Sequence, residues 1–131
     1  MKYAVLFIAL LFAGCDEGSS TDGGYETFTI AGETMQVAKE DFPKSMSWDD
    51  AQSACEGLGN GWRLPSEDEL KAMYEQLHKQ GKGNFKDDWY WSSSQSLSRS
   101  AWLVGFLDGS VGYDVNGKGF NYRVRAVRAK P

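Results

Sequence analysis

The sequence contains few of the residue types that build catalytic centres and covalent cross-links. Its 131 residues include one His, His78, and two Cys, Cys15 and Cys55. If Cys15 is used for another chemistry, as argued below, the domain cannot form an internal disulfide and must be held together by packing alone. One His and one Cys on an apolar helix face supply neither a nucleophile–base pair nor a metal-ligand cluster. We therefore expect no enzyme, no catalytic residues, no metal and no cofactor.

Basic charge is also scarce. The chain has 14 Lys and Arg against 18 Asp and Glu, which gives a net charge of −4. Nucleic acids and anionic lipid headgroups both favour proteins with a basic face. We therefore expect no nucleic-acid partner.

No apolar run is long enough to span a bilayer. Residues 3–13 form an apolar run of eleven residues behind Lys2, whereas a membrane-spanning helix needs about 20. Eleven residues is the length of a signal-peptide core. The run ends in Ala13-Gly14-Cys15, which resembles a bacterial lipobox. We therefore predict a lipoprotein signal peptide over 1–14 and lipidation of Cys15; the alternative is an ordinary secretory leader with an incidental Cys.

A lipidated Cys15 would anchor the mature chain in a membrane of the bacterial cell envelope, at the outer membrane or cell surface. Residues 16–24 contain no apolar side chain, so we predict that 15–24 are the lipidated Cys and a flexible tether. The composition, 41% hydrophobic and 24% charged, is typical of a globular protein, and the remaining length suits one domain over 25–131.

Alternating apolar residues predict two hairpins. The first covers 25–38 and turns at 31–33, and the second turns at Asp108-Gly109. A two-residue turn there would pair Phe106 with Val111, Val104 with Tyr113 and Trp102 with Val115. This register places Trp102, Phe106 and Tyr113 in the core. We expect a turn at 116–119 and a closing strand over 120–128.

Two helices are predicted from capping residues and apolar periodicity. Ser47 is the expected N-cap of the first helix, and Ser66 with Glu69 forms a capping box at the start of the second. One apolar face of each helix should be buried, with Cys55 as an unreactive thiol on the first. The expected core residues of this region are Trp48, Leu58, Trp62, Leu70, Met73 and Leu77.

An ordered set of motifs carries a resemblance to a known family. The motifs are Ser47–Gln52 (SWDDAQ), Gly61–Ser66 (GWRLPS), Trp89–Ser94 (WYWSSS), Ala101-Trp102, Asp108-Gly109 and Tyr122–Arg128 (YRVRAVR). Together they resemble the Lcl C-terminal domain family over roughly residues 35–128. The resemblance implies an α+β, C-type-lectin-like fold with two helices packed on a twisted antiparallel sheet and adjacent chain ends.

The same resemblance implies a distant relation to the formylglycine-generating enzyme. That enzyme works through a late pair of reactive Cys, and this chain has no Cys after Cys55. The Glu-Pro-Asn and Trp-Asn-Asp motifs of calcium-dependent lectins are also missing. An enzyme is therefore the weakest alternative.

The family's founding member is an adhesin that binds sulfated polysaccharide, which implies a binding or adhesion module. We expect the ligand, a polysaccharide or a surface protein, to lie against segment 86–99 and the loop at 116–121. The expected ligand-binding residues are Trp89, Ser94, Gln95, Asn116 and Asn121. The basic row Arg123, Arg125 and Arg128 is more typical of paired or solvated side chains than of a binding site. A structural envelope module that binds other proteins remains the main alternative.

Overall fold

The computed structural model describes residues 21–95, 100–114 and 120–131. Cys15, Asn116 and the turn at 116–119 therefore lie outside the described residues. The elements, in chain order, are β1 (Thr21–Asp22), β2 (Tyr25–Ile30), β3 (Glu33–Val37), α2 (Trp48–Glu56), α3 (Glu67–Gln76), the 3-10 helix η1 (His78–Gln80), β4 (Trp89–Gln95), β5 (Ala101–Gly105), β6 (Val111–Asp114) and β7 (Val127–Ala129). This confirms the predicted α+β class, with two antiparallel sheets in place of one.

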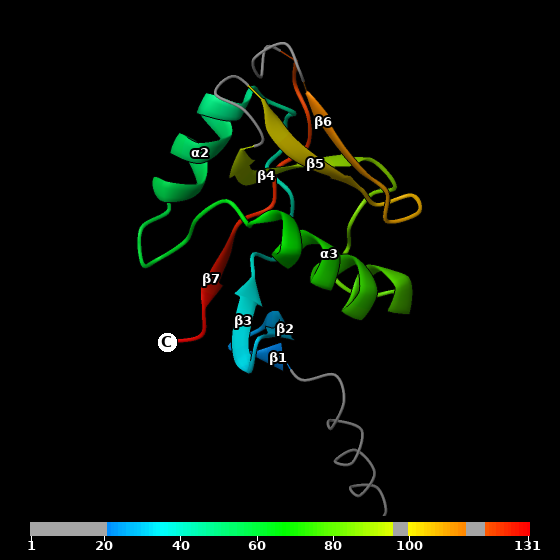
Figure 1. Cartoon of the computed structure of the whole chain (residues 1–131). Coiled ribbons are helices and arrows are strands. Elements are labelled where there is room, and N and C mark those ends of the chain that lie inside the picture. The colour runs from blue at the N-terminus through cyan, green and yellow to red at the C-terminus, as the bar shows by residue number, and fades with distance from the viewer. Residues whose placement is uncertain (1–20, 96–99, 115–119) are drawn as a thin grey trace, which may run out of the picture.

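The first sheet has the strand order β1-β2-β3-β7. The predicted hairpin forms β2 and β3, and its turn residues Ala31 and Gly32 both have positive φ, at 51° and 82°. This is the backbone that a two-residue hairpin turn requires. β1 pairs with β2, so the sheet begins within the predicted tether. β7 pairs with β3, which brings the end of the chain into the sheet that contains its first strands (Figure 1).

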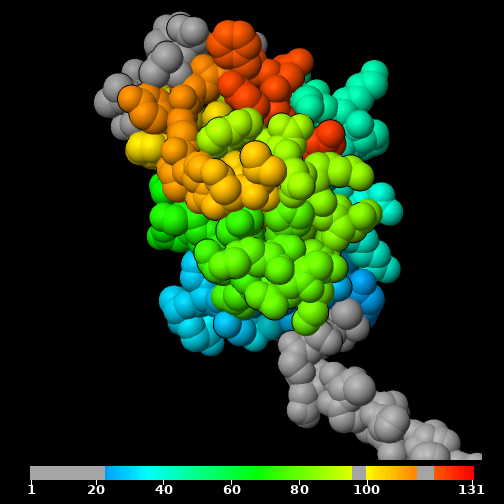
Figure 2. Space-filling view, turned by 90° about the vertical axis from the view of Figure 1, so that its right-hand side faces the viewer, coloured from blue at the N-terminus to red at the C-terminus, as the bar shows by residue number. Residues whose placement is uncertain are grey.

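The second sheet has the order β4-β5-β6, and the predicted register of its hairpin is wrong by two residues. Trp102 pairs with Tyr113 and Val104 with Val111, so the connection covers 106–109 instead of two residues. Gly109 has φ +83°, and a Cβ on it would lie 2.8 Å from the Tyr74 ring. The connection thus closes against α3, and Figure 2 shows its yellow-orange atoms beside the green atoms of α3 and η1.

A shift of two residues leaves each side chain on its predicted face, but not every one of them is buried. Phe106 is buried as predicted, whereas Trp102 is only partly buried and Tyr113 is 49% exposed. The core assignment of Tyr113 is therefore wrong. The reason is that α3 packs on β4 and β5, whereas β6 is the edge strand.

Both helices begin where predicted. Ser47 Oγ accepts a hydrogen bond from the Asp50 amide, and Ser66 and Glu69 form the complete capping box. The first helix ends at Glu56, so the apolar periodicity does not reach Leu58, which is 46% exposed. The core assignment of Leu58 is therefore wrong; the other five predicted core residues of the region are buried, namely Trp48, Trp62, Leu70, Met73 and Leu77.

Each helix contributes to one of two core clusters. α3 packs between the sheets and contacts β2, β4 and β5, as Figure 1 also shows. Its cluster includes Phe28, Met35, Leu70, Met73, Tyr90, Val104 and Phe106. α2 contacts β4, and its cluster includes Trp48, Ala51, Cys55, Trp62, Leu64, Trp91, Leu103 and Val124.

The C-terminal segment is not the single strand that the sequence predicts. Its Arg123 carbonyl accepts from the Trp91 amide at 3.0 Å, and its Val124 and Ala126 carbonyls accept from Phe42 and Ala38. Only Val127–Ala129 then joins a sheet, as β7. The segment therefore runs from β4 of one sheet to β3 of the other and ties them together.

Within the described ranges, no helix is both long and apolar enough to cross a membrane.

Candidate functional site

The Trp89 side chain lies across the second sheet, with one face of its indole covering the backbone. Trp89 is opposite Gly105 in the β4–β5 pair. A Cβ built on Gly105 would be 3.2, 3.3 and 3.3 Å from three consecutive atoms of the six-membered ring. Nearly equal distances to consecutive atoms place that position over the ring face and not at its edge. Gly112, on β6, is also next to the ring, with a corresponding distance of 3.4 Å.

Glycine at 105 suits this arrangement, because a Cβ there would press on the ring and the indole would have to shift by a few tenths of an ångström. Trp89 is 37% exposed, so part of its side chain remains open to solvent. The predicted exposure of Trp89 is confirmed. The result is an aromatic surface held on a rigid sheet.

A groove of about 200 Å³ lies around this ring. Its lining residues are Asp87, Asp88, Trp89, Gly105, Leu107, Asp108 and Ser110. The lining carries three carboxylates and no Lys, Arg or His. We call this feature the Trp89 groove.

Two of the carboxylates contact basic side chains outside the groove lining. Asp87 Oδ1 lies 2.6 Å from His78 Nε2, and Asp88 Oδ2 accepts from Arg123 Nε at 3.0 Å. Asp88 Oδ1 also accepts from the Trp89 amide at 2.8 Å. These contacts fix the two acids at the start of β4.

Asp108, which also lines the groove, has a different environment. Its carboxylate accepts hydrogen bonds from the hydroxyl and the amide of Ser110. These hydrogen bonds lower the pKa of Asp108, so the group stays ionised in mildly acidic solution. No ion pair to Asp108 is found among the described residues.

Of the predicted ligand-binding residues that the structure describes, one lines the groove. Trp89 lines it, whereas Ser94 accepts a hydrogen bond from the Glu67 amide at 3.1 Å and so helps to begin α3. Gln95 and Asn121 are exposed and do not line the groove. Their ligand-binding roles stay predictions.

The sequence analysis does not predict that Leu107, Asp108 and Ser110 line a groove with Trp89. Asp108 had been interpreted as a turn residue only. The sequence shows a turn at Asp108-Gly109, among these residues. The contact of Trp89 with Gly105 depends on the register of the strands, and the register predicted for the adjoining β5–β6 hairpin is wrong.

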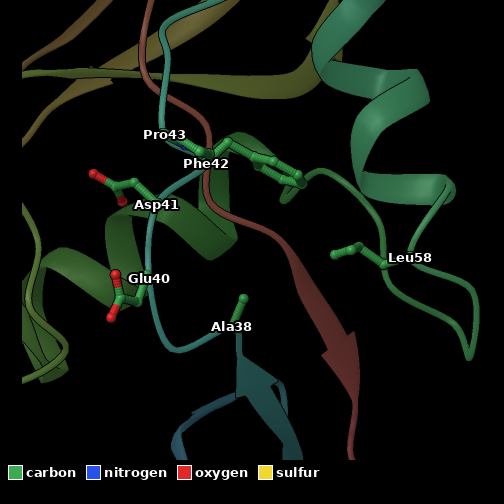
Figure 3. Close-up of a pocket in the computed structure, with 6 residues that line it drawn as sticks. All are labelled: Ala38, Glu40, Asp41, Phe42, Pro43 and Leu58. Carbon is green, nitrogen blue, oxygen red and sulfur yellow. The ribbon is translucent and has the colours of Figure 1, made fainter.

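A second hollow, of about 230 Å³, is apolar. Figure 3 shows the side chains of Ala38, Phe42 and Leu58 converging on it, while the carboxylates of Glu40 and Asp41 point to the other side of their segment. Since the acidic groups point elsewhere, this hollow offers no chemistry beyond apolar contact.

The three late arginines serve the fold. The buried Arg125 donates to Asp41 Oδ1 at 2.8 Å, and Arg128 lies 4.5 Å over the Trp62 ring. Arg123 pairs with Asp88 of the Trp89 groove. The interpretation as paired side chains is confirmed for Arg123 and Arg125, whereas Arg128 donates to the Gln36 side chain and the Asn60 carbonyl.

Cys55 and His78 have different environments in the fold. Cys55 is fully buried as predicted, and burial, followed by the nearby Glu56 charge, raises the pKa of its thiol to about 12. His78 packs its ring on Phe106 and contacts Asp87. Within the described part of the chain, no three His, Cys, Asp or Glu residues are grouped to hold a metal ion.

The fold and the groove define a small α+β domain with an aromatic surface feature. The sequence model of the Lcl C-terminal domain matches residues 26–128. The chain therefore belongs to the Lcl C-terminal domain family, a domain of unknown function. No curated protein matches the chain.

Proposed function

We propose that this protein is a non-catalytic binding module, lipid-anchored in a bacterial envelope, that recognises carbohydrate in the Trp89 groove. The observation that carries the proposal is the partly exposed Trp89 side chain, which packs against Gly105 and lines a groove. A pyranose ring has an apolar C–H face that can stack on such a surface.

The rim of the groove supports a polar ligand. Carboxylate oxygens of Asp87, Asp88 and Asp108 accept hydrogen bonds, and the Ser110 hydroxyl lies beside them. An apolar surface with a few oriented polar groups is typical of small-ligand sites. The inert thiol of Cys55 supports binding without catalysis.

The anchoring part of the proposal is supported by the sequence. The short apolar run ending in Ala13-Gly14-Cys15 and the polar residues after it suit a lipidated Cys followed by a spacer. A domain held in this way would present its surface to ligands outside the cell.

A structural module that binds envelope proteins is the second candidate. It is favoured by the Trp102–Tyr113 pair, whose ring centroids lie 5.0 Å apart on the hairpin that ends at the sheet edge. Exposed aromatic side chains are enriched in protein interfaces. A pull-down from intact envelopes, set beside a glycan array, discriminates the two candidates.

Three variants test the carbohydrate groove on the array. Trp89→Ala should lose the bound glycan, and Gly105→Ala should weaken binding because its Cβ would force the indole to move. Gly112→Ala is the matched control, since its Cβ would make an ordinary contact at 3.4 Å. Thermal melts of all three check folding.

Two results would contradict the proposal. One is wild-type glycan binding by a folded Trp89→Ala variant. The other is turnover of a substrate by the purified protein, which would overturn its non-catalytic part.

A further inference from the structure

We infer that the Trp89 groove selects a sugar with a protonated amine over N-acetylated and sulfated sugars. This inference rests on the proposed carbohydrate-binding function and adds the class of ligand. It follows from the charges around the ring.

The groove has an excess of negative charge. Of its three carboxylates, Asp87 contacts His78 and Asp88 pairs with Arg123. Asp108 makes no ion pair among the described residues, and its hydrogen bonds from Ser110 keep it ionised. One carboxylate of the groove lining, that of Asp108, is therefore available to a cation.

An amino sugar complements this arrangement at two points. Its C–H face would pack against the part of Trp89 that lines the groove, while its ammonium group would donate hydrogen bonds to Asp108 of the same lining. Charge-assisted hydrogen bonds are stronger than neutral ones, and a cation close to an indole gains a further attraction from the ring. N-acetylation removes the positive charge, and with it the charge-assisted hydrogen bond and the attraction of the cation to the indole.

An anionic sugar faces the opposite situation. A sulfate group in the groove would lie among Asp87, Asp88 and Asp108, with no cationic side chain in the lining. Arg123, which contacts the lining residue Asp88, already pairs with it and lies 3.7 Å from Asp41. Repulsion between like charges therefore disfavours sulfated polysaccharide here.

The test measures binding of three oligosaccharides to the full chain in detergent by calorimetry at mildly acidic pH. The probes are a trimer of glucosamine, a trimer of N-acetylglucosamine and a heparin oligosaccharide. The glucosamine trimer should bind about fivefold more tightly than the N-acetylated trimer, the effect of one solvent-exposed ion pair. Heparin should bind most weakly.

Asp108→Asn should abolish the preference for the free amine, so that the two trimers bind the variant with similar affinity. Asp68→Asn, which removes an exposed charge at the start of α3, is the matched control and should keep the preference. Trp89→Ala should weaken both trimers.

The outcomes separate this inference from the proposed function. Equal affinity for the two trimers, tighter binding of heparin, or an unchanged preference in Asp108→Asn overturns the amine selectivity alone, provided that Trp89→Ala still weakens binding. A trilysine peptide that binds as tightly as the glucosamine trimer also overturns it, in favour of a basic protein ligand. If no saccharide binds, both are overturned.

Discussion

Glu69 joins the start of α3 to the loop before it through hydrogen bonds that require a carboxylate. Its two oxygens accept from Arg63 Nη1 and Nη2, both at 2.8 Å, and Oε1 also accepts from the Ser66 amide at 2.8 Å. Burial alone would raise the pKa of Glu69, but the hydrogen bonds from Arg63 and Ser66 outweigh it and the pKa is lowered. The charged form is therefore the one that stabilises the fold.

The sign of the pH dependence follows from that shift. A carboxylate whose folded pKa is lowered contributes stability above its unfolded value, near 4.5, and loses it as the pH falls through the folded value. Glu69→Gln should cost about 1–2 kcal/mol at neutral pH, allowing for the partial exposure of Arg63. The difference in unfolding free energy between wild type and variant should become smaller at pH values below the unfolded-state pKa of Glu69. Urea unfolding at a series of pH values measures this.

The matched control is Glu75→Gln on the same helix, which removes an exposed ion pair to Lys79 of η1. It should leave the free energy of unfolding nearly unchanged, because exposed ion pairs contribute little. A Glu69→Gln gap that stays constant down to acidic pH would contradict the assigned pKa direction.

At the scale of the element, α3 is the helix that connects the two sheets, because its buried stripe contacts strands of both. Leu70 is fully buried in the cluster that also contains Phe28 of β2 and Val104 of β5. Leu70→Ala should therefore cost about 2–5 kcal/mol in the free energy of unfolding. Denaturant melts measure this loss.

Leu58 supplies the same substitution at an exposed site. Because Leu58 follows the end of α2 and is half exposed, Leu58→Ala should change the free energy of unfolding by no more than about 0.5 kcal/mol. Similar losses for the two variants would show that the helix faces are misplaced.

Elements set by neighbouring residues could be predicted from the sequence. The capping residues Ser47 and Ser66 act within three positions of themselves, and the 31–32 turn depends on its own backbone, so each was placed correctly. The register of the β5–β6 hairpin was predicted wrongly. Its connection packs Gly109 against Tyr74, a residue distant in the sequence. The end of α2 before Leu58 was missed because apolar spacing continues past the helix.

The candidate site was predictable in one residue and not as a whole. Trp89 could be identified as exposed from the acidic residues before it. The wall at Asp108 and the ring's contact with Gly105 depend on strand pairing and on the course of the β5–β6 connection. The C-terminal segment illustrates the same limit, since its hydrogen bonds are divided between β4 and the region after β3.

For the whole molecule, the two sheets lie at opposite ends, with α3 between them (Figure 1). The described chain enters at β1, in the first sheet, whereas Trp89 is in the second. An anchor that precedes β1 would therefore hold the first sheet towards the membrane and the Trp89 groove away from it. This geometry connects the proposed anchor with the proposed binding site.

The last prediction concerns that anchor. The full chain expressed in a bacterial host should fractionate with membranes, and intact-mass analysis should find lipid on a mature chain that begins at Cys15. Cys15→Ala should release the protein from the membrane because the thiol that carries the lipid is gone.

The released protein should bind glycan with unchanged affinity, since the groove residues lie in the distant sheet, while cells carrying it should lose attachment to glycan-coated beads. A Cys55→Ala variant should keep the membrane location. A wild-type chain that is soluble and begins at another residue, or a Cys15→Ala chain that stays in the membrane, would contradict lipidation.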